Sequence, residues 1–141
     1  MHLVSVRIIT SRIEELVRFY EQVTGVTATR YTPDFAEIKT PTATLAIGST
    51  NTLQFFGGDD IARPVHNHSV IIEFLVGDVQ QHFEQLPAAI KDSIVQEPTT
   101  MPWGNRSLLL RDPDGHLVNL FTPVTPEAIA KFKNGWPDKL E

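Results

Sequence analysis

The chain lacks several features that mark common classes of protein. It has no cysteine in 141 residues, which excludes disulfides, thiol nucleophiles and thiolate metal ligands. Its 12 Lys and Arg residues are outnumbered by 17 Asp and Glu residues, so a basic surface for nucleic acid is not expected. It has neither a run of about 20 apolar residues that would span a membrane nor a basic segment followed by an apolar one at its N-terminus. We therefore expect a soluble, cytoplasmic protein that binds neither nucleic acid nor membrane.

The composition is typical of one globular domain. Hydrophobic residues make up 41% of the chain and charged residues 21%, which supplies enough apolar surface for a core at this length. The net charge of −5 favours a small, solvated ligand over a polyanionic partner. We expect a single domain over residues 1–141.

The N-terminal half predicts a strand, a helix and a small antiparallel meander. Segment 4–10 is rich in β-formers, and Ser11 and Glu14 have the spacing of a capping box that opens a helix. Apolar residues then recur on one helical face until Gly25, which can take the positive φ that suits a helix C-terminus. These apolar residues are Ile13, Leu16, Val17 and Tyr20. Strand-like runs follow at 28–31, 36–39, 43–47 and 53–56.

The same order of elements returns after a connector at 57–67. A strand is expected at 70–76, and Val79, Phe83 and Leu86 repeat the helical pattern of Ile13, Val17 and Tyr20 at a shift of 66 residues. A closing hairpin at 107–121 repeats 44–56 at a shift near 65. Its turn, 112–115, reads Asp-Pro-Asp-Gly, in which Pro presets φ and Gly tolerates positive φ. Each half therefore reads βαβββ, an internal repeat.

The last segment lies outside both repeats. Thr125 followed by Pro126 and Glu127 is typical of a helix N-cap and first turn, so a short C-terminal helix is expected. A lone aromatic such as Trp136 usually supplies buried area, and we expect it to pack this tail onto the body rather than bind a ligand.

The hairpin at 102–121 and the paired βαβββ modules resemble the vicinal-oxygen-chelate superfamily of glyoxalases, extradiol dioxygenases and bleomycin-resistance proteins. The resemblance covers roughly residues 3–123. It implies an α+β fold of two tandem βαβββ modules, whose mixed sheets curl around a shared cup, with module one at about 3–57, module two at about 68–123 and a tail at 124–141. Because many members are homodimers, the resemblance also implies a homodimer here.

In the metal-dependent members of that superfamily, metal ligands come from the opening and closing strands of the modules. Alignment of the two halves places Ser5 opposite Ile71, and Gln54 opposite Asn119, where the family commonly has a glutamate. This set offers a hydroxyl and two neutral amides, whereas a catalytic divalent metal favours carboxylates and imidazoles. We therefore expect no metal and no cofactor. The alternative is a divalent metal held by substituted ligands such as Glu73 and His68.

The charged residues of the opening strands are the candidates for chemistry. Because strand side chains alternate, Arg7 shares a face with Ser5, and Glu73 shares a face with Ile71. The two charges would pair as a polar floor of the cup, or they would only tie the opening strands together. Glu73 and Arg7 are also the candidate catalytic residues, in proton transfer or electrostatic stabilisation.

Aromatic residues complete the expected ligand site. Trp103, in a Pro-Trp-Gly run before the closing hairpin, would line the mouth of the cup or else plug the core. Phe56 and Phe121 follow Gln54 and Asn119 by two residues and would form apolar walls. The hypothesis is a metal-free protein that binds a small aromatic or amphipathic molecule. The alternative is a divergent metal-dependent lyase, isomerase or dioxygenase, and a metal-free enzyme is the third possibility.

Overall fold

The computed structural model describes residues 1–58 and 60–133 of the chain. They form two compact units, each containing one four-stranded mixed sheet. Unit 1 comprises 1–68 together with 112–115, and unit 2 comprises 69–111 together with 116–141. Trp136, expected to pack the tail, lies outside the described residues. No helix in the described part of the chain is both long enough and apolar enough to cross a membrane.

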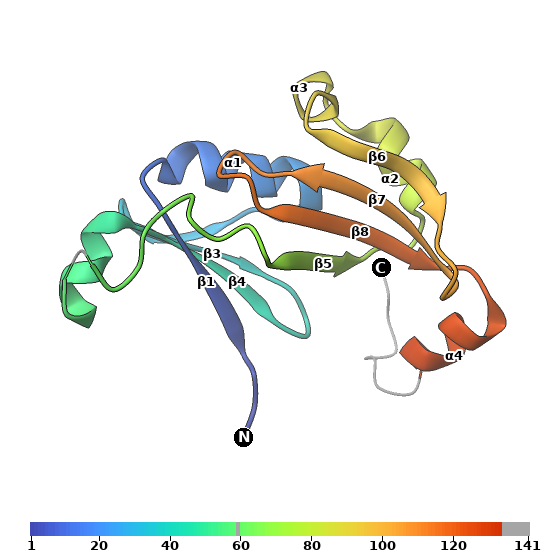
Figure 1. The fold of residues 1–141 in the computed structure, drawn as a ribbon, viewed down its shortest axis with the longest axis horizontal. Helices are drawn as coiled ribbons and strands as arrows, with labels where there is room; N and C mark the ends of the chain where they lie inside the picture. Colours follow the sequence, from blue (N-terminus) through green and yellow to red (C-terminus); the bar gives the residue numbers. More distant parts are fainter. Residues whose placement is uncertain (59, 134–141) are drawn as a thin grey trace. The chain divides into compact units, whose positions relative to one another are not determined.

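Unit 1 has the predicted strand, helix and meander (Figure 1). Its elements are β1 (Ser5–Thr10), α1 (Ile13–Thr24), β2 (Thr29–Thr32), β3 (Phe35–Lys39), β4 (Thr44–Ser49) and the 3₁₀ helix η1 (Thr50–Phe56). The strands are ordered β1-β4-β3-β2, with β1 parallel to β4 and the other pairs antiparallel. The helix α1 ends as expected at Gly25, which has φ of 71° and whose N–H bonds to the Glu21 carbonyl.

Unit 2 repeats this arrangement. Its elements are β5 (Ile71–Leu75), α2 (Val79–Gln85), α3 (Ala88–Lys91), β6 (Ile94–Thr100), β7 (Asn105–Arg111), β8 (Leu117–Pro123) and α4 (Pro126–Lys133). The strands are ordered β5-β8-β7-β6, and β5 is parallel to β8. The α+β fold of paired βαβββ modules and the C-terminal helix are therefore confirmed. The helix α4 begins where Thr125 Oγ1 accepts the Ala128 N–H at 3.3 Å.

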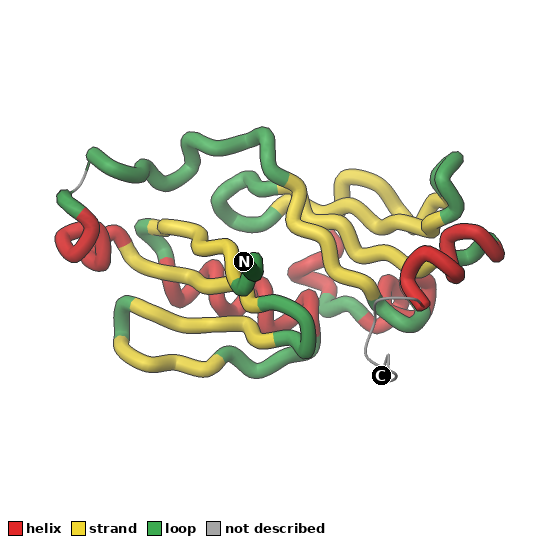
Figure 2. The backbone as a smooth tube through the Cα atoms, turned by 90° about the horizontal axis from the view of Figure 1, so that it is seen from below, coloured by secondary structure: helices red, strands yellow, loops and turns green. Residues whose placement is uncertain are grey.

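The core of unit 1 lies between α1 and its sheet. Five residues of α1 are buried, and they meet apolar residues of the strands. They are Leu16, Val17, Phe19, Tyr20 and Val23. Figure 2 shows the helix running along one side of the strands. Tyr20 is a core residue, as the helical pattern predicts, and its ring meets that of the buried Phe19 edge to face with centroids 5.2 Å apart.

The structure corrects two details of the predicted elements. Ser11 and Glu14 do not form a capping box: the residue that precedes α1 is Arg12, whose N–H bonds instead to Thr10 Oγ1 at 3.0 Å. Residues 53–56 are not a strand but the end of η1. Three hydrophobic residues in four favoured a strand there, but the chain has already left the sheet, because β4 is the strand that completes it.

The repeat is therefore aligned differently at its closing strand. Ser5 pairs with Thr44 and Ile71 with Leu117, so the opening strands do correspond at a shift of 66. Arg7 pairs with Ala46, however, and Glu73 pairs with Asn119. The counterpart of Asn119 is thus Ala46 and not Gln54. By the same register, the counterpart of Phe121 is Gly48 and not Phe56.

Candidate functional site

One face of the sheet in unit 2 is turned away from its helix α2. The Val79 N–H donates to Thr122 Oγ1 at 2.8 Å, and Arg106 donates to Gln80 Oε1 at 3.1 Å, so these side chains face α2. Because strand side chains alternate, the neighbouring positions lie on the other face, which we call open face 2. It carries Glu73, Asn105, Ser107, Leu109, Asn119 and Phe121.

A carboxylate and an amide meet at the centre of open face 2. Asn119 Nδ2 donates to Glu73 Oε2 at 2.8 Å, which orients the Glu73 carboxylate and leaves the amide oxygen pointing elsewhere. Asn119 is only 7% exposed, and its Oδ1 has no hydrogen-bond partner among the described residues. Ser107, 1% exposed, and Asn105 also carry buried oxygens without a partner in that part of the chain. Buried polar atoms are nearly always paired, so open face 2 has unused hydrogen-bonding capacity.

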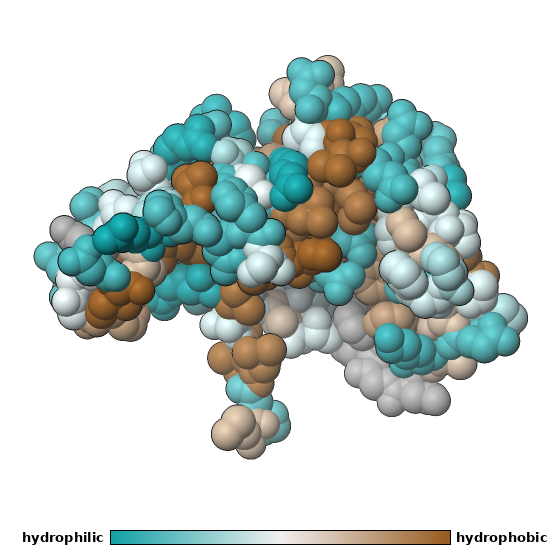
Figure 3. All heavy atoms as spheres, viewed as in Figure 1, coloured by the Kyte–Doolittle hydropathy of each residue, from teal (hydrophilic) through white to brown (hydrophobic). Residues whose placement is uncertain are grey.

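Aromatic and apolar side chains surround this polar group. Phe121 is buried, and its ring lies 5.3 Å from that of Phe132 in α4. Figure 1 shows α4 beyond the end of β8. Figure 3 shows hydrophobic side chains gathered over the strands of unit 2, where Ile71 and Val95 are exposed. The combination of an apolar surround with a few polar groups is typical of small-molecule sites.

The sheet of unit 1 also has a face turned away from its helix. Arg30 Nη1 lies 2.9 Å from Glu14 Oε1 of α1, so the even-numbered positions of β2 and β3 face the helix. The opposite side, which we call open face 1, carries Ser5, Arg7, Phe35, Glu37, Lys39, Ala46 and Gly48. The Arg7 guanidinium carbon lies 4.6 Å from the centroid of Phe35 and 5.3 Å from that of Phe56. Arginine is held in this way by the negative faces of aromatic rings.

The second cation of open face 1 is paired. Lys39 Nζ donates to Tyr31 Oη at 2.5 Å and lies 3.5 Å from Glu37 Oε2. The hydrogen bond to Tyr31 is the main cause that raises the pKa of Lys39. Tyr31 Oη in turn donates to Glu37 Oε2 at 3.2 Å, and the Tyr31 ring lies 5.7 Å from that of Phe35. Lys39 is therefore neutralised by Glu37, whereas Arg7 makes no ion pair with the described residues of unit 1.

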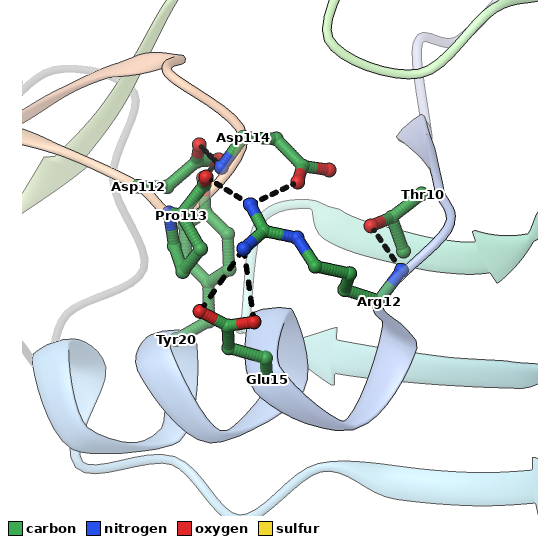
Figure 4. Close-up of polar contacts among 7 residues, drawn as sticks. All are labelled: Thr10, Arg12, Glu15, Tyr20, Asp112, Pro113 and Asp114. Carbon is green, nitrogen blue, oxygen red and sulfur yellow. Dashed lines mark hydrogen bonds and ion pairs between the residues drawn. The ribbon is translucent and has the colours of Figure 1, made fainter.

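The turn at 112–115 belongs to unit 1 and is held there by a polar network (Figure 4). Tyr20 Oη donates to Asp112 Oδ2 at 2.7 Å, and Arg12 Nη2 donates to the Pro113 carbonyl and lies 3.2 Å from Asp114 Oδ1. Asp112 Oδ1 also accepts the Asp114 N–H at 2.9 Å, the side-chain bond expected of this turn. Burial, followed by the Asp112 charge, raises the pKa of Tyr20. These contacts position the turn and leave Asp114 Oδ2 buried without a hydrogen-bond partner among the described residues.

The predicted site residues are thus divided between the two units. In unit 1, Arg7 and Phe56 lie together, Ser5 lies on β1 with Arg7, and Gln54 is exposed on η1. In unit 2, Glu73 and Asn119 lie together beside Phe121 on open face 2. Trp103 lies in the turn before β7 and is 66% exposed, so it does not plug the core.

The expected alternative metal ligands do not form a cluster. His68 is exposed in unit 1, where its ring lies beside Gly115, and Glu73 belongs to unit 2. Among residues 1–58 and 60–133, no three His, Asp or Glu side chains come together as a group that could hold a metal ion.

Several site residues were missed by the sequence analysis. Phe35 and Gly48 on open face 1, and Asn105 and Ser107 on open face 2, were not singled out. Phe35 had a usable signal, because it alternates with Glu37 and so shares the face of a charged residue. Ser107 stands before three leucines and gave no signal of its own. Its role depends on the pairing of β7 with β8, which places it opposite Phe121.

The fold has counterparts among known proteins. The model of the Glyoxalase/Bleomycin resistance protein/Dioxygenase superfamily matches residues 2–120. A glyoxalase/bleomycin resistance protein/dioxygenase family enzyme from Burkholderia phytofirmans PsJN is 18% identical, with a TM-score of 0.73, covering 88% of this chain and 100% of that one. A glyoxalase/bleomycin resistance protein/dioxygenase from Nocardioides is 20% identical, with a TM-score of 0.71, covering 100% of this chain and 90% of that one. No curated protein matches the sequence.

Proposed function

The chain belongs to the Glyoxalase/Bleomycin resistance protein/Dioxygenase superfamily, and from this membership we propose that it is a metal-free protein that binds a small aromatic or amphipathic molecule. The binding surface of the proposal includes open face 2, where a polar centre is set among apolar side chains. Binding of this kind requires no bond to be made or broken. The superfamily hosts several chemistries on one scaffold, so the residues of the site, together with the membership, decide which of them is proposed.

The observation that carries the proposal is the unused hydrogen-bonding capacity of open face 2. Asn119 Oδ1 and Ser107 Oγ are buried without a partner in the described part of the chain, and an unpaired buried polar group costs about 1–3 kcal/mol. A ligand that donates N–H or O–H groups would remove that cost. The oriented Glu73 carboxylate adds a charged acceptor, and Phe121 adds an apolar surface. The face therefore suits a molecule with an apolar body and hydrogen-bond donors.

The residues at the family's metal positions do not fit a metal. With the register of the strands, those positions are occupied by Ser5, Ala46, Ile71 and Asn119. Ala46 and Ile71 have no donor atom, and the other two offer only a hydroxyl and a neutral amide. A catalytic site needs about three good donors and an open position. The corrected alignment thus leaves an even poorer set of donors than the one that contained Gln54.

Metal content is the first test of this proposal. Protein purified without an affinity tag is expected to contain far less than one equivalent of Mn, Fe, Ni or Zn by elemental analysis. Added metal is expected to leave the melting temperature unchanged. A stoichiometric metal that is lost in Glu73→Ala would overturn the proposal and favour the lyase, isomerase or dioxygenase alternative.

Ligand binding is the second test. A panel of small aromatic amines and phenols is screened by ligand-observed NMR against the wild type, Asn119→Leu and Ser107→Ala. We expect binders whose affinity falls about tenfold in either variant, because each loses a hydrogen bond to a buried acceptor. Gln54→Ala is the matched control, since Gln54 is an exposed amide on η1. Equal affinities in all four proteins would exclude open face 2 as the site.

The assembly state is a separate proposal. We propose a homodimer, as in many members of the superfamily, and size-exclusion chromatography with light scattering measures its mass directly. A monomer at high concentration would contradict it without affecting the proposed binding function.

A further inference from the structure

The open face of unit 1 presents a fixed cation to solvent. The Arg7 guanidinium lies over the rings of Phe35 and Phe56, and its N–H groups donate no hydrogen bond to the described residues. It makes no ion pair with the described residues of unit 1, whereas Arg12, Arg30 and Arg63 each have a carboxylate partner. These partners are Glu15 and Asp114 for Arg12, Glu14 for Arg30 and Asp60 for Arg63. Arg18 lies on α1, away from this face.

The backbone beneath Arg7 allows this arrangement. A Cβ added at Gly48 would lie 3.7 Å from Arg7 Cδ and 3.1 Å from Thr52 Oγ1. A Cβ would therefore only touch the arginine stem but would crowd Thr52, and the glycine leaves this space beside the stem empty. Gly48 has no positive φ, so the requirement at this position is space and not backbone conformation.

The aromatic side chains form a row on the same face. The Tyr31 ring lies 5.7 Å from the Phe35 ring, and the Arg7 guanidinium contacts both Phe35 and Phe56. Phe56 is exposed, and Figure 3 shows hydrophobic side chains over η1, where Phe55 and Phe56 lie. Lys39, the second cation, is already neutralised by Glu37 at 3.5 Å. Open face 1 therefore combines exposed aromatic surface with one uncompensated positive charge.

We propose that Arg7, Phe35 and Phe56 form a subsite for a small planar aromatic carboxylate. The carboxylate would accept two parallel hydrogen bonds from the edge of the guanidinium, the geometry in which arginine recognises this group. The ring of the ligand would pack on the exposed phenylalanine surface. The subsite rests on the proposed function in one respect, because both assume that the open faces bind small molecules. It adds a ligand class that open face 2, rich in acceptors, does not predict.

The test compares 2-naphthoate with its neutral counterpart 2-naphthamide, by ligand-observed NMR titration of the full chain. The wild type is expected to bind 2-naphthoate at least tenfold more tightly than the amide, because a hydrogen bond to a charged group is stronger than a neutral one. Arg7→Gln is expected to abolish that preference and leave binding of the amide unchanged. Arg7→Lys is expected to restore only part of it, because a lysine cannot form the fork.

Arg30→Gln is the matched control, because Arg30 is an exposed arginine on the helix face of the same sheet. It is expected to bind 2-naphthoate as the wild type does. Far-UV circular dichroism and melting temperature establish that each variant is folded. If Arg7→Gln were unfolded, the Arg7→Lys result would carry the test, since that change keeps the charge and the aliphatic stem.

Three results would overturn the subsite. No preference for 2-naphthoate in the wild type would exclude it, and so would a preference that survives Arg7→Gln. A loss of the preference in Arg30→Gln as large as that in Arg7→Gln would show that the effect is not specific to Arg7. The proposed function fails separately, through bound metal or through aromatic amines and phenols that do not respond to Asn119→Leu and Ser107→Ala.

Discussion

The two units have the same order of elements, but their open faces carry opposite charges at equivalent positions. Arg7 pairs with Ala46 in unit 1 where Glu73 pairs with Asn119 in unit 2. Two residues further along the closing strand, Gly48 stands where unit 2 has Phe121. The strand register thus fixes where a side chain lies, while its chemistry differs completely between the units. The βαβββ fold therefore sets the positions of the site residues but does not determine what the site binds.

The helix layers of the units also differ. The helix α1 is 12 residues long and buries five side chains, whereas α2 has seven residues and buries only Val79. In unit 1, α1 also supplies Tyr20 and the preceding Arg12 to hold the turn at 112–115. We infer that unit 1 derives more of its stability from its helix. Unit 2 derives more from residues that lie on its strands, including Phe121.

The largest effect is expected when the size of the side chain is changed at the two equivalent positions, Gly48 in unit 1 and Phe121 in unit 2. Phe121→Ala is expected to lower the free energy of unfolding by about 3–5 kcal/mol, because a buried ring is lost against Phe132. Gly48→Phe is expected to cost about 1–3 kcal/mol or more, because a side chain there collides with Thr52. Denaturant unfolding measures both. A cost below about 1 kcal/mol for Phe121→Ala would contradict the packing of open face 2.

Tyr20→Phe tests the helix layer of unit 1. Loss of the hydrogen bond to Asp112 is expected to cost about 1–3 kcal/mol at pH 7. The folded pKa of Tyr20 is raised above its usual value of 10.0, mainly by burial. Above that pH the unfolded chain releases the proton and the folded chain keeps it, so stability falls as pH rises. This contribution is complete below pH 10 and decreases above it, by up to about 1.4 kcal/mol per pH unit.

The measurement for Tyr20 is the difference in slope between wild type and Tyr20→Phe in urea unfolding from pH 9 to pH 11. The variant is expected to lose stability less steeply over that range. Phe19→Leu, which changes a buried neighbour of Tyr20 that does not titrate, is the control and should keep the wild-type slope. Parallel slopes in wild type and Tyr20→Phe would show that Tyr20 is not held neutral in the folded state.

Asn119→Asp sharpens the contrast in charge between the open faces. It replaces the amide that donates to Glu73 with a second carboxylate, so at pH 7 a hydrogen bond becomes a repulsion. We expect a loss of about 1–1.5 kcal/mol that shrinks as pH falls below about 5, where one carboxylate is protonated and can donate again. Asn119→Leu is the control, because it removes the hydrogen bond to Glu73 without adding a carboxylate, so its loss should depend much less on pH. A pH-independent loss in Asn119→Asp would argue against the Glu73 contact.

The sequence predicted the parts of the fold that depend on local patterns. Helical spacing identified α1 and its buried Tyr20, and the Asp-Pro-Asp-Gly run identified the turn whose Gly115 has φ of 90°. It failed at residues 53–56, because a short apolar run does not distinguish a strand from a 3₁₀ turn. That error shifted the alignment and made Gln54 the counterpart of Asn119. The contact of Arg7 with Phe35 depends on a diagonal across three strands, which requires the register.

Replacement of Gln54 has the smallest expected effect and tests the corrected alignment directly. Gln54 is exposed on η1, so Gln54→Ala should change the free energy of unfolding by less than about 0.5 kcal/mol. Asn119→Ala, at a buried position that pairs with Glu73, should cost clearly more. Equal costs would restore the equivalence of the two amides. Because both changes remove the same functional group, any difference between them reports position, and position is what the strand register assigns.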